Sequence, residues 1–523
     1  MARNPIRLAR GFLTVGAWTL LSRIAGFARD VMMAAYLGAG PAAEAFLVAF
    51  SLPNMFRRFF AEGAFNMAFV PLFAKKVEGD EDARGFAEDA FAALSAFLVV
   101  FTVLGTLLMP WLVLAMAAGF RGDERFDLAV LYGRIGFVYI LFISLVALLS
   151  GILNTFGRFT EATIVPVLMN LMFIAAMWIA DLAGWDMGLT LAWTVPVTGV
   201  AQLAFTWWMA ARAGWAPRLR MPRLTPELRH LAVVAAPALL AGGVVQVNLL
   251  VGRQVASFFE GAVAWLSYAD RLYQLPLGVV GIAIGTVLLP DLSRRLRAGD
   301  AEGGRHAFNR ATEIGLALTI PAAVALVVIA QPLILALFER GAFGRADTVA
   351  TAATLAVYGA GLPAFVLHKV LQPLFYARED TASPFRFAVW SMVVNAAVAV
   401  GCAPLIEGVA PGWGFLAAAL GTTVAGWTMA WQLWRGARGG MGEAARADDR
   451  LRARLPRILL ASLLMGAVLW VVAGMLEGAL TGGGPTRWGA LAALVALGLG
   501  VYGAAGWALG AFRPADLRAA LRR

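Results

Sequence analysis

Arginines occur in stretches of this chain that are apolar enough to lie in a membrane. Arg23 and Arg29 fall in one such stretch, and Arg57 and Arg58 fall in the next. A charged side chain at the centre of a bilayer costs roughly 2.5–3.5 kcal/mol on insertion scales, so four of them cost about 10 kcal/mol or more. Arginine stays ionised and offers a planar fork of donors that suits phosphate or carboxylate. The pattern therefore predicts an anion-binding site within the membrane.

Nearby acidic side chains offer these arginines a second role, in internal ion pairs. Asp30 directly follows Arg29, and Glu62 lies four residues after Arg58, a spacing that brings two side chains together on one face of a helix. Arg57 has no such neighbour in the sequence. We therefore expect Arg57 to be a better ligand candidate than Arg58, which Glu62 could neutralise.

The spacing of the first pair sets a geometric condition on a shared site. Six residues separate Arg23 from Arg29, which places them about 240° apart around a straight helix. Both can face one cavity only if the helix bends. Gly26 lies between them and is the candidate hinge.

Further charges lie inside other apolar stretches. Arg271 lies deep in one, beside Asp270, but adjacent side chains on a helix do not face each other, so we expect Arg271 to line a cavity. Lys369 lies about two helical turns from the end of its stretch, where a cavity role and snorkelling to the interface are equally compatible with its position. Glu44 lies near the start of the second apolar stretch, at 42–73, and is a candidate gate or interface residue.

Composition identifies the class of protein. Of 523 residues, 60% are hydrophobic and 14% are charged, whereas a soluble domain carries about a quarter charged residues. Runs long enough to cross a ~30 Å hydrocarbon core number fourteen. We therefore predict an all-α polytopic membrane protein with about fourteen transmembrane helices, in runs at 12–37, 42–73, 88–118, 128–157, 162–181, 188–211, 230–258, 262–292, 311–338, 348–377, 384–406, 412–434, 456–478 and 487–512.

The basic residues predict the topology. Thirty of the 43 lysines and arginines fall in loops on the side of the N-terminus and only five in loops on the opposite side. By the positive-inside rule, both termini are cytoplasmic. The net charge of +11 is thus a topology signal, and we expect no nucleic-acid partner. The single cysteine, Cys402, and three scattered histidines provide no metal constellation, so we expect no metal and no resident cofactor.

A weak internal repeat divides the chain. Residues 64–76 share the plan of residues 283–295: Pro71 matches Pro290, and each proline precedes a pair of basic residues. Six crossings separate the two segments, so the repeats have the same orientation, as in transporters that place the substrate between repeats. We predict an N-terminal lobe with six helices, a C-terminal lobe with six, and two extra helices, at 1–215, 216–440 and 441–523.

Several motifs together resemble those of one family. SRIAGFARD at 22–30, LPNMFRRFFAEGAF at 52–65, AFVP at 68–71 and YADRL at 268–272 resemble the MurJ (MviN) family of lipid II flippases. The resemblance implies the fold of the MOP exporter superfamily, with two lobes around a cationic cavity and a groove for the lipid tail at the last two helices. It also implies a substrate, the undecaprenyl-diphosphate-linked peptidoglycan precursor, moved by alternating access from the inner to the outer leaflet of the bacterial cytoplasmic membrane.

The resemblance also assigns residues. Functional arginines of the family map onto Arg23, Arg29, Arg57 and Arg271, and an important acidic position maps onto Glu44. The full predicted set comprises the substrate ligands Arg23, Arg29, Arg57, Arg58, Arg271 and Lys369, and the gating or charge-pair residues Asp30, Glu44, Glu62 and Asp270.

The family's sodium site is incomplete in this chain. Gly252 stands where some relatives carry an aspartate, although Asn395 and Thr422 could match other parts of that site. Coupling to the membrane potential or to a monovalent cation stays open.

Other functions are compatible with parts of this pattern. An exporter of drugs or of another lipid-linked oligosaccharide would share the fold. An enzyme acting on polyprenyl phosphates would need paired carboxylates for Mg²⁺. Besides the solvated loop at 79–82, Asp448-Asp449 and Glu379-Asp380 are adjacent acids near a cytoplasmic face, and we expect them to be solvated loop charges. We therefore expect a monomeric transporter and not an enzyme, with the lipid-linked substrate and membrane lipids as its partners.

Overall fold

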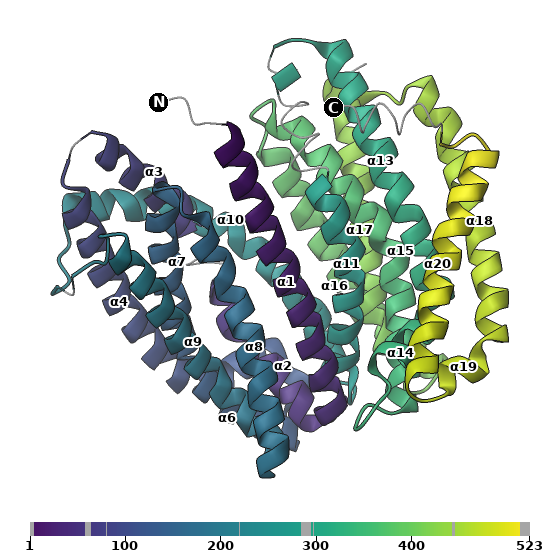
Figure 1. Cartoon of the computed structure of the whole chain (residues 1–523), viewed down its shortest axis with the longest axis horizontal. Coiled ribbons are helices and arrows are strands. Elements are labelled where there is room, and N and C mark those ends of the chain that lie inside the picture. The colour runs from purple at the N-terminus through teal and green to yellow at the C-terminus, as the bar shows by residue number, and fades with distance from the viewer. Residues whose placement is uncertain are drawn as a thin grey trace. The chain divides into compact units, whose positions relative to one another are not determined.

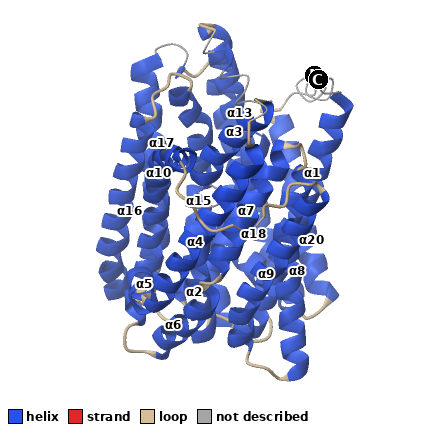
Figure 2. Ribbon diagram, turned by 90° about the vertical axis from the view of Figure 1, so that its left-hand side faces the viewer, coloured by secondary structure: helices blue, strands red, loops and turns tan. Residues whose placement is uncertain are grey.

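The protein is helical throughout its described part. The computed structural model describes residues 5–57, 64–79, 81–218, 220–283, 294–295, 298–441 and 445–512, and among these no strand occurs beyond one isolated bridge between Arg340 and Phe343 (Figures 1 and 2). The chain divides into two compact units, Met1–Ala264 and Trp265–Arg523. The predicted all-α class is confirmed.

The first unit is built on a few helix pairs. Helix α1 packs against α8, α2 against α6, α9 against both α7 and α8, and α10 against α3. The helices are α1 (Pro5–Leu37), α2 (Pro41–Arg57), α3 (Ala64–Glu78), α4 (Ala83–Leu107), α5 (Met109–Met116), the 3₁₀ helix η2 (Ala118–Phe120), α6 (Glu124–Gly136), α7 (Tyr139–Thr155), α8 (Phe159–Ala183), α9 (Met187–Arg212) and α10 (Pro226–Ala256).

The second unit is organised around α15. This helix packs against α13, α14 and α17; α16 pairs with α17, and α18 joins α13 to α20. The helices are α11 (Ala262–Ala283), which begins at the boundary, α13 (Ala301–Val328), α14 (Ala330–Phe338), α15 (Arg345–Tyr376), α16 (Ala382–Val409), α17 (Leu416–Met441), α18 (Asp449–Met475), α19 (Glu477–Thr481) and α20 (Pro485–Ala508).

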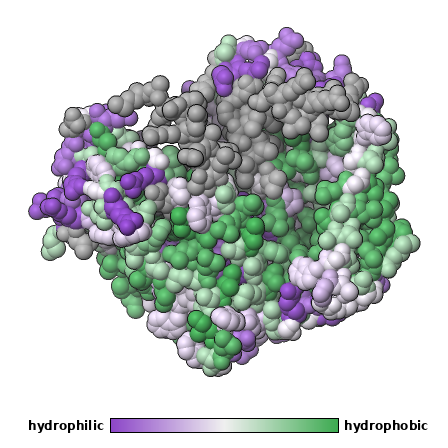
Figure 3. All heavy atoms as spheres, viewed as in Figure 1, coloured by the Kyte–Doolittle hydropathy of each residue, from purple (hydrophilic) through white to green (hydrophobic). Residues whose placement is uncertain are grey.

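The helices have the surface of a membrane protein. Among the described residues, nine helices are long and apolar enough to cross a bilayer. Large apolar side chains such as Trp111 and Leu182 are about 70% exposed, and hydrophobic residues cover much of the visible face in Figure 3. Every one of the fourteen predicted runs contains described helix, but the exact count of fourteen crossings stays a prediction. Several predicted runs contain two helices. In the run at 88–118, α4 ends at Leu107 and α5 begins at Met109, just before Pro110.

The packing units and the predicted lobes follow different criteria. Helix α10, which the repeat places in the second lobe, packs against α3, α4 and α5 and belongs to the first unit. Helices α18 and α20, predicted to stand outside the repeat, belong to the second unit. A repeat boundary records sequence similarity and a unit boundary records contacts, so the lobe division stays a prediction.

Buried ions attach α18 to the rest of the second unit. Glu313 on α13 is 6% exposed and accepts hydrogen bonds from the guanidinium groups of Arg310, Arg450 and Arg454. Arg310 also donates to Asp448 at 2.6 Å. Because three cations surround Glu313, the arrangement fixes the N-terminal turn of α18 against α13.

Asp448 differs from its predicted role as a solvated loop charge. Its carboxylate caps α18 by accepting from the Leu451 backbone N–H at 2.7 Å, and it is partly buried. Burial would raise the pKa of Asp448, but the Leu451 N–H and the Arg310 guanidinium outweigh that effect and hold the pKa below its usual value. Asp449 is fully exposed, as expected. The sequence reading was wrong for Asp448 because its partner Arg310 is distant in the sequence.

Gly119 marks a close approach of two backbone segments within the first unit. Its backbone N–H donates to Ser257 Oγ at 3.0 Å, and a Cβ there would lie 2.4 Å from the Ser257 backbone carbon. A backbone atom cannot move aside as a flexible side chain can. We expect Gly119→Ala to lower stability by roughly 1–3 kcal/mol, the usual range for overpacking, measured as a lower Tm of the detergent-solubilised protein.

Gly16→Ala is the matched control, because a Cβ at Gly16 meets no atom within 4 Å. An equal Tm for Gly119→Ala and Gly16→Ala would contradict the tight packing between η2 and the end of α10.

Candidate functional site

Arg29 on α1 is buried, and each nitrogen of its guanidinium donates a hydrogen bond. The residue is 7% exposed. Its Nε and one terminal nitrogen donate to Asp30 Oδ1 at 3.0 and 2.7 Å. The other terminal nitrogen donates to Asn170 Oδ1 on α8 at 3.0 Å. The guanidinium also lies 5.6 Å from the ring centre of Phe173. The ion-pair role considered for Arg29 is therefore the one that the structure contains.

Adjacent residues on a helix face in different directions, yet the Arg29 side chain is long enough to fold back on Asp30. Asn170 then completes the arrangement: its Nδ2 donates to the Ser22 carbonyl on α1 at 2.9 Å. One amide thus bonds both the backbone of α1 and the buried guanidinium. Sequence reasoning missed Asn170, because a single asparagine 141 residues from Arg29 carries no local signal.

Gly26 does not act as a break in the helix. Helix α1 runs from Pro5 to Leu37 without interruption, and a Cβ at Gly26 would lie 3.2 Å from Asn170 Nδ2. The glycine therefore lets α8 approach α1, and a bend of α1 at Gly26 stays a prediction. Arg23 is exposed and Arg29 is buried, so the two arginines have different surroundings.

Arg57 ends α2 and is partly buried. The adjacent Phe56 packs edge-on against Phe101 and Phe137, with ring centres 5.0 and 5.8 Å away. Arg58 and Glu62 lie outside the described residues, so their predicted pairing stays a prediction.

Among the predicted acids that the structure describes, Glu44 is the most buried, at 1% exposed. Its Oε2 accepts from Arg125 on α6 at 3.1 Å, and its Oε1 accepts from the Val263 backbone N–H at 3.0 Å. Arg125 also donates to Asp123 and lies 4.5 Å from the centre of the Phe120 ring. Glu44 therefore forms a charge pair that joins three segments of the first unit.

Arg125 lies between two of the predicted membrane runs, 88–118 and 128–157, and is not among the predicted site residues. It is 5% exposed, and its partner Glu44 lies 81 residues earlier. In the sequence, Arg125 follows Asp123 by two residues near the start of a helix. That spacing alone does not indicate that the arginine is buried or that Glu44 is its partner. A gating role for Glu44 stays a prediction.

The second unit carries the other predicted ligands. Arg271 on α11 and Lys369 on α15 are both exposed, and Asp270 is partly buried. Gln274, one turn after Asp270, donates to its carboxylate. Asp270 is thus engaged along its own helix.

The residues considered for sodium lie at the contact of α16 and α17. Asn395 is 2% exposed, and a Cβ at Gly421 would lie 2.6 Å from Asn395 Oδ1. The Thr422 hydroxyl donates to the Ala418 carbonyl at 3.1 Å, within its own helix. Across the described ranges, no group of three histidine, cysteine or carboxylate residues could hold a metal ion.

Comparison with known proteins identifies the family. A profile described as "Lipid II flippase MurJ" matches residues 33–481. A "Probable lipid II flippase MurJ" of Rhizobium meliloti (strain 1021) is 43% identical over 532 residues, covering 99% of this chain and 96% of the relative. The chain belongs to the MurJ family of lipid II flippases. A "Lipid II flippase MurJ" of Burkholderia cenocepacia is 37% identical over 403 residues, 75% of this chain and 77% of the relative.

Solved structures agree with MurJ membership at the level of fold. A lipid II flippase MurJ in an inward closed conformation has a TM-score of 0.77 at 24% identity and covers 94% of this chain and 98% of that chain. An inward-facing multidrug resistance MATE transporter of the MOP superfamily has a TM-score of 0.68 at 16% identity, with 83% and 98% covered. The predicted family and superfamily fold are confirmed.

The Arg29 ion pair generates a prediction about stability. Asp30→Asn leaves the buried guanidinium without its counter-charge, and breaking a buried pair costs about 3–5 kcal/mol. We expect a large fall in Tm, with part of the loss recovered in the double variant Arg29→Gln/Asp30→Asn.

Asp181→Asn on α8 is the control, because Asp181 makes an exposed hydrogen bond with Tyr36. We expect it to change stability by about 0.5 kcal/mol or less. If Asp30→Asn unfolded at the wild-type temperature, the counter-charge of Asp30 would not be what stabilises the buried Arg29.

Proposed function

We propose that this protein translocates lipid II, the undecaprenyl-diphosphate-linked peptidoglycan precursor, from the inner to the outer leaflet of the bacterial cytoplasmic membrane. The observation that carries the proposal is family membership across residues 33–481, with relatives of nearly the same length. The relatives named above are lipid II flippases by description. Such a function makes the protein a transporter and not an enzyme.

The proposed topology and mechanism extend that function. Both termini face the cytoplasm, on the evidence of the thirty-to-five distribution of basic residues. The protein works as a monomer by alternating access. Membrane lipids surround its apolar exterior, which Figure 3 shows on one face.

The arginines of the first unit have unequal parts in the proposed substrate site. Arg23 is exposed and Arg57 ends α2, so each is a candidate for direct contact with the diphosphate. Arg29 and Asp30 form a neutral pair, so a diphosphate that binds Arg29 competes with the Asp30 carboxylate for the guanidinium. A diphosphate supplies about two negative charges against one from Asp30, but a full exchange would leave Asp30 buried without its counter-charge. Arg58, Arg271 and Lys369 stay predicted ligands.

A second candidate function is export of another lipid-linked oligosaccharide or of drugs. The likeness to a MATE transporter favours it only at the level of fold, since identity is 16%. A drug exporter would have no need of arginines at positions 23, 29 and 57.

Growth rescue tests the flippase proposal. A strain depleted of its own lipid II flippase should grow when it expresses the wild-type chain. Arg23→Ala should fail to rescue, because the diphosphate loses a contact, while the variant's amount in the membrane stays at the wild-type level. Arg23 is a better test than Arg29, whose removal strands a buried carboxylate.

Arg223→Ala is the control, since Arg223 is exposed in the loop between α9 and α10 and is expected to rescue fully. Failure of the membrane-inserted wild-type chain would count against lipid II translocation. Rescue by Arg23→Ala equal to the wild type would leave the flippase proposal intact and remove Arg23 from its mechanism.

We propose that the driving force is the membrane potential, or a monovalent cation other than sodium. Position 252 is glycine, so the carboxylate that some relatives are expected to contribute to a sodium site is missing from this chain. Moving one charge across the potential provides about 2.3 kcal/mol per 100 mV, enough to bias alternating access.

We therefore expect lipid II transport in proteoliposomes to continue when potassium replaces sodium, and to fall when an ionophore removes the potential. The same liposomes without protein are the control for leakage of the lipid. A strict requirement for sodium would contradict this proposal.

A further inference from the structure

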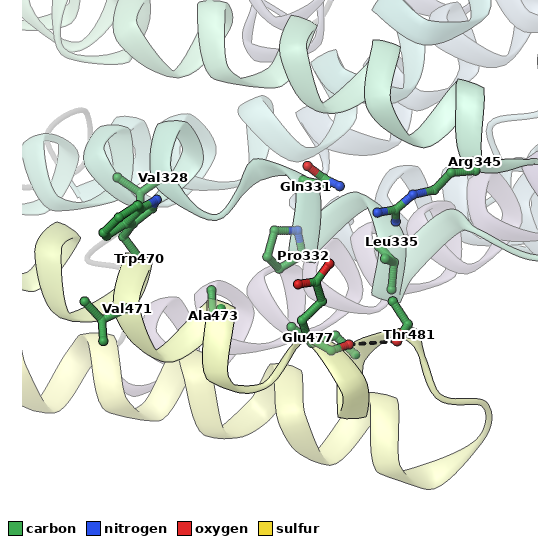
Figure 4. Close-up of a pocket in the computed structure, with 12 residues that line it drawn as sticks. Val328, Gln331, Pro332, Leu335, Arg345, Trp470, Val471, Ala473, Glu477 and Thr481 are labelled. Atoms are coloured by element: carbon green, nitrogen blue, oxygen red, sulfur yellow. Dashed lines mark hydrogen bonds between the residues drawn. The ribbon is translucent and has the colours of Figure 1, made fainter.

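A pocket of about 510 Å³ lies within the second unit, between α14 and the end of α18. Its floor is apolar and includes Val328, Pro332, Leu335 and Trp470, while Arg345 and Glu477 supply charge at its edge (Figure 4). The volume falls in the range of pockets that hold small ligands. None of these residues is a predicted ligand of the diphosphate, although Trp470 and Glu477 lie in the segment 441–523, where the lipid-tail groove is expected.

The two charged side chains come from different elements and have opposite signs. Arg345 is the first residue of α15, and Glu477 is the first residue of α19. Figure 4 shows the guanidinium of Arg345 and the carboxylate of Glu477 on the pocket side of their helices. The pocket therefore offers one cation and one anion above an apolar floor.

The charged groups of Arg345 and Glu477 are both accessible to a ligand. Arg345 is 49% exposed at its side chain and makes one long contact, 3.5 Å, with Glu339. Glu477 is exposed, and no ion pair to its carboxylate is found within the described part of the chain. The hydrogen bond from Thr481 goes to the Glu477 backbone carbonyl, as the dashed line in Figure 4 marks, and leaves the carboxylate available.

The residues near the pocket indicate that it lies at the membrane interface, where lipid headgroups meet the hydrocarbon. Helix α18 ends at Met475, and both Met475 and Trp470 are more than 70% exposed. Trp488, 44% exposed, begins the return helix α20 at the same end. Exposed tryptophans collect at membrane interfaces because one edge of the indole is polar.

We propose that this pocket binds one molecule of phosphatidylethanolamine. Arg345 binds the phosphate, Glu477 binds the ammonium group, and the start of an acyl chain lies along Pro332, Leu335 and Trp470. Arginine suits phosphate and a carboxylate suits a primary ammonium, so the charges of the pocket match those of a zwitterionic headgroup. This lipid site is separate from the proposed transport of lipid II and does not rest on it.

Other membrane components match the pocket less well. Phosphatidylglycerol has a phosphate for Arg345 but no cation for Glu477, and it brings its negative charge close to that carboxylate. A polyprenyl chain would fill the floor and leave both charges without a partner. Desolvating an unpaired charge is unfavourable, so the zwitterion is preferred.

Native mass spectrometry of the detergent-solubilised full-length protein tests the proposal. Phosphatidylethanolamine and phosphatidylglycerol with identical acyl chains are titrated separately, and undecaprenyl phosphate is added as a competitor. We expect phosphatidylethanolamine to bind about tenfold more tightly than phosphatidylglycerol, the effect of one additional charge-assisted contact. Glu477→Gln should abolish that preference, and Arg345→Gln should weaken the binding of both phospholipids.

Arg121→Gln and Glu124→Gln are the matched controls, because both residues are exposed at the start of α6 in the other unit. Each control should keep the wild-type preference. Equal affinity of the wild type for the two phospholipids would overturn the proposal, as would an unchanged preference in Glu477→Gln. Displacement of phosphatidylethanolamine by an equal concentration of undecaprenyl phosphate would identify the pocket as a polyprenyl site and would also overturn it.

Discussion

The structure depends on the requirement that a charge taken out of water be met by an opposite charge or by hydrogen bonds. Arg29 is met by Asp30 and Asn170, Arg125 by Glu44 and Asp123, and three arginines surround Glu313. The desolvation penalty of an unpaired ion amounts to several kcal/mol, so each group restricts the positions of the helices that carry it. The buried charges thus act as attachment points between helices.

These attachments matter because the lipid gives little help in holding helices together. Lipid tails are as apolar as leucine side chains, so helix association in a bilayer relies on close packing and polar contacts. Small residues provide the packing: Gly26 admits Asn170, and Gly421 admits Asn395. In both places a glycine on one helix faces an amide on its neighbour, and at Asn170 the amide also donates to the Ser22 carbonyl and accepts from Arg29.

The same requirement distinguishes two arginines of one helix. Arg29 has the motif context of a ligand, yet each nitrogen of its guanidinium donates to Asp30 or Asn170, whereas Arg23 is exposed. In the proposed site, a diphosphate would compete with Asp30 for Arg29 and would find Arg23 exposed. The structure thus distinguishes two arginines that the family resemblance treats alike.

The sequence alone determined that the protein is a helical membrane protein, because hydropathy is a local property of each run, and every predicted run contains described helix. It also determined the family, because the motif around Arg23, Arg29 and Arg57 is specific and continuous. It did not determine the roles of Asn170, Arg125 and Asp448, whose partners lie between 81 and 141 residues away. Only the tertiary structure brought those partners together. Whether two charged groups form a pair depends on their distance in space, and the order of residues along the chain does not give that distance.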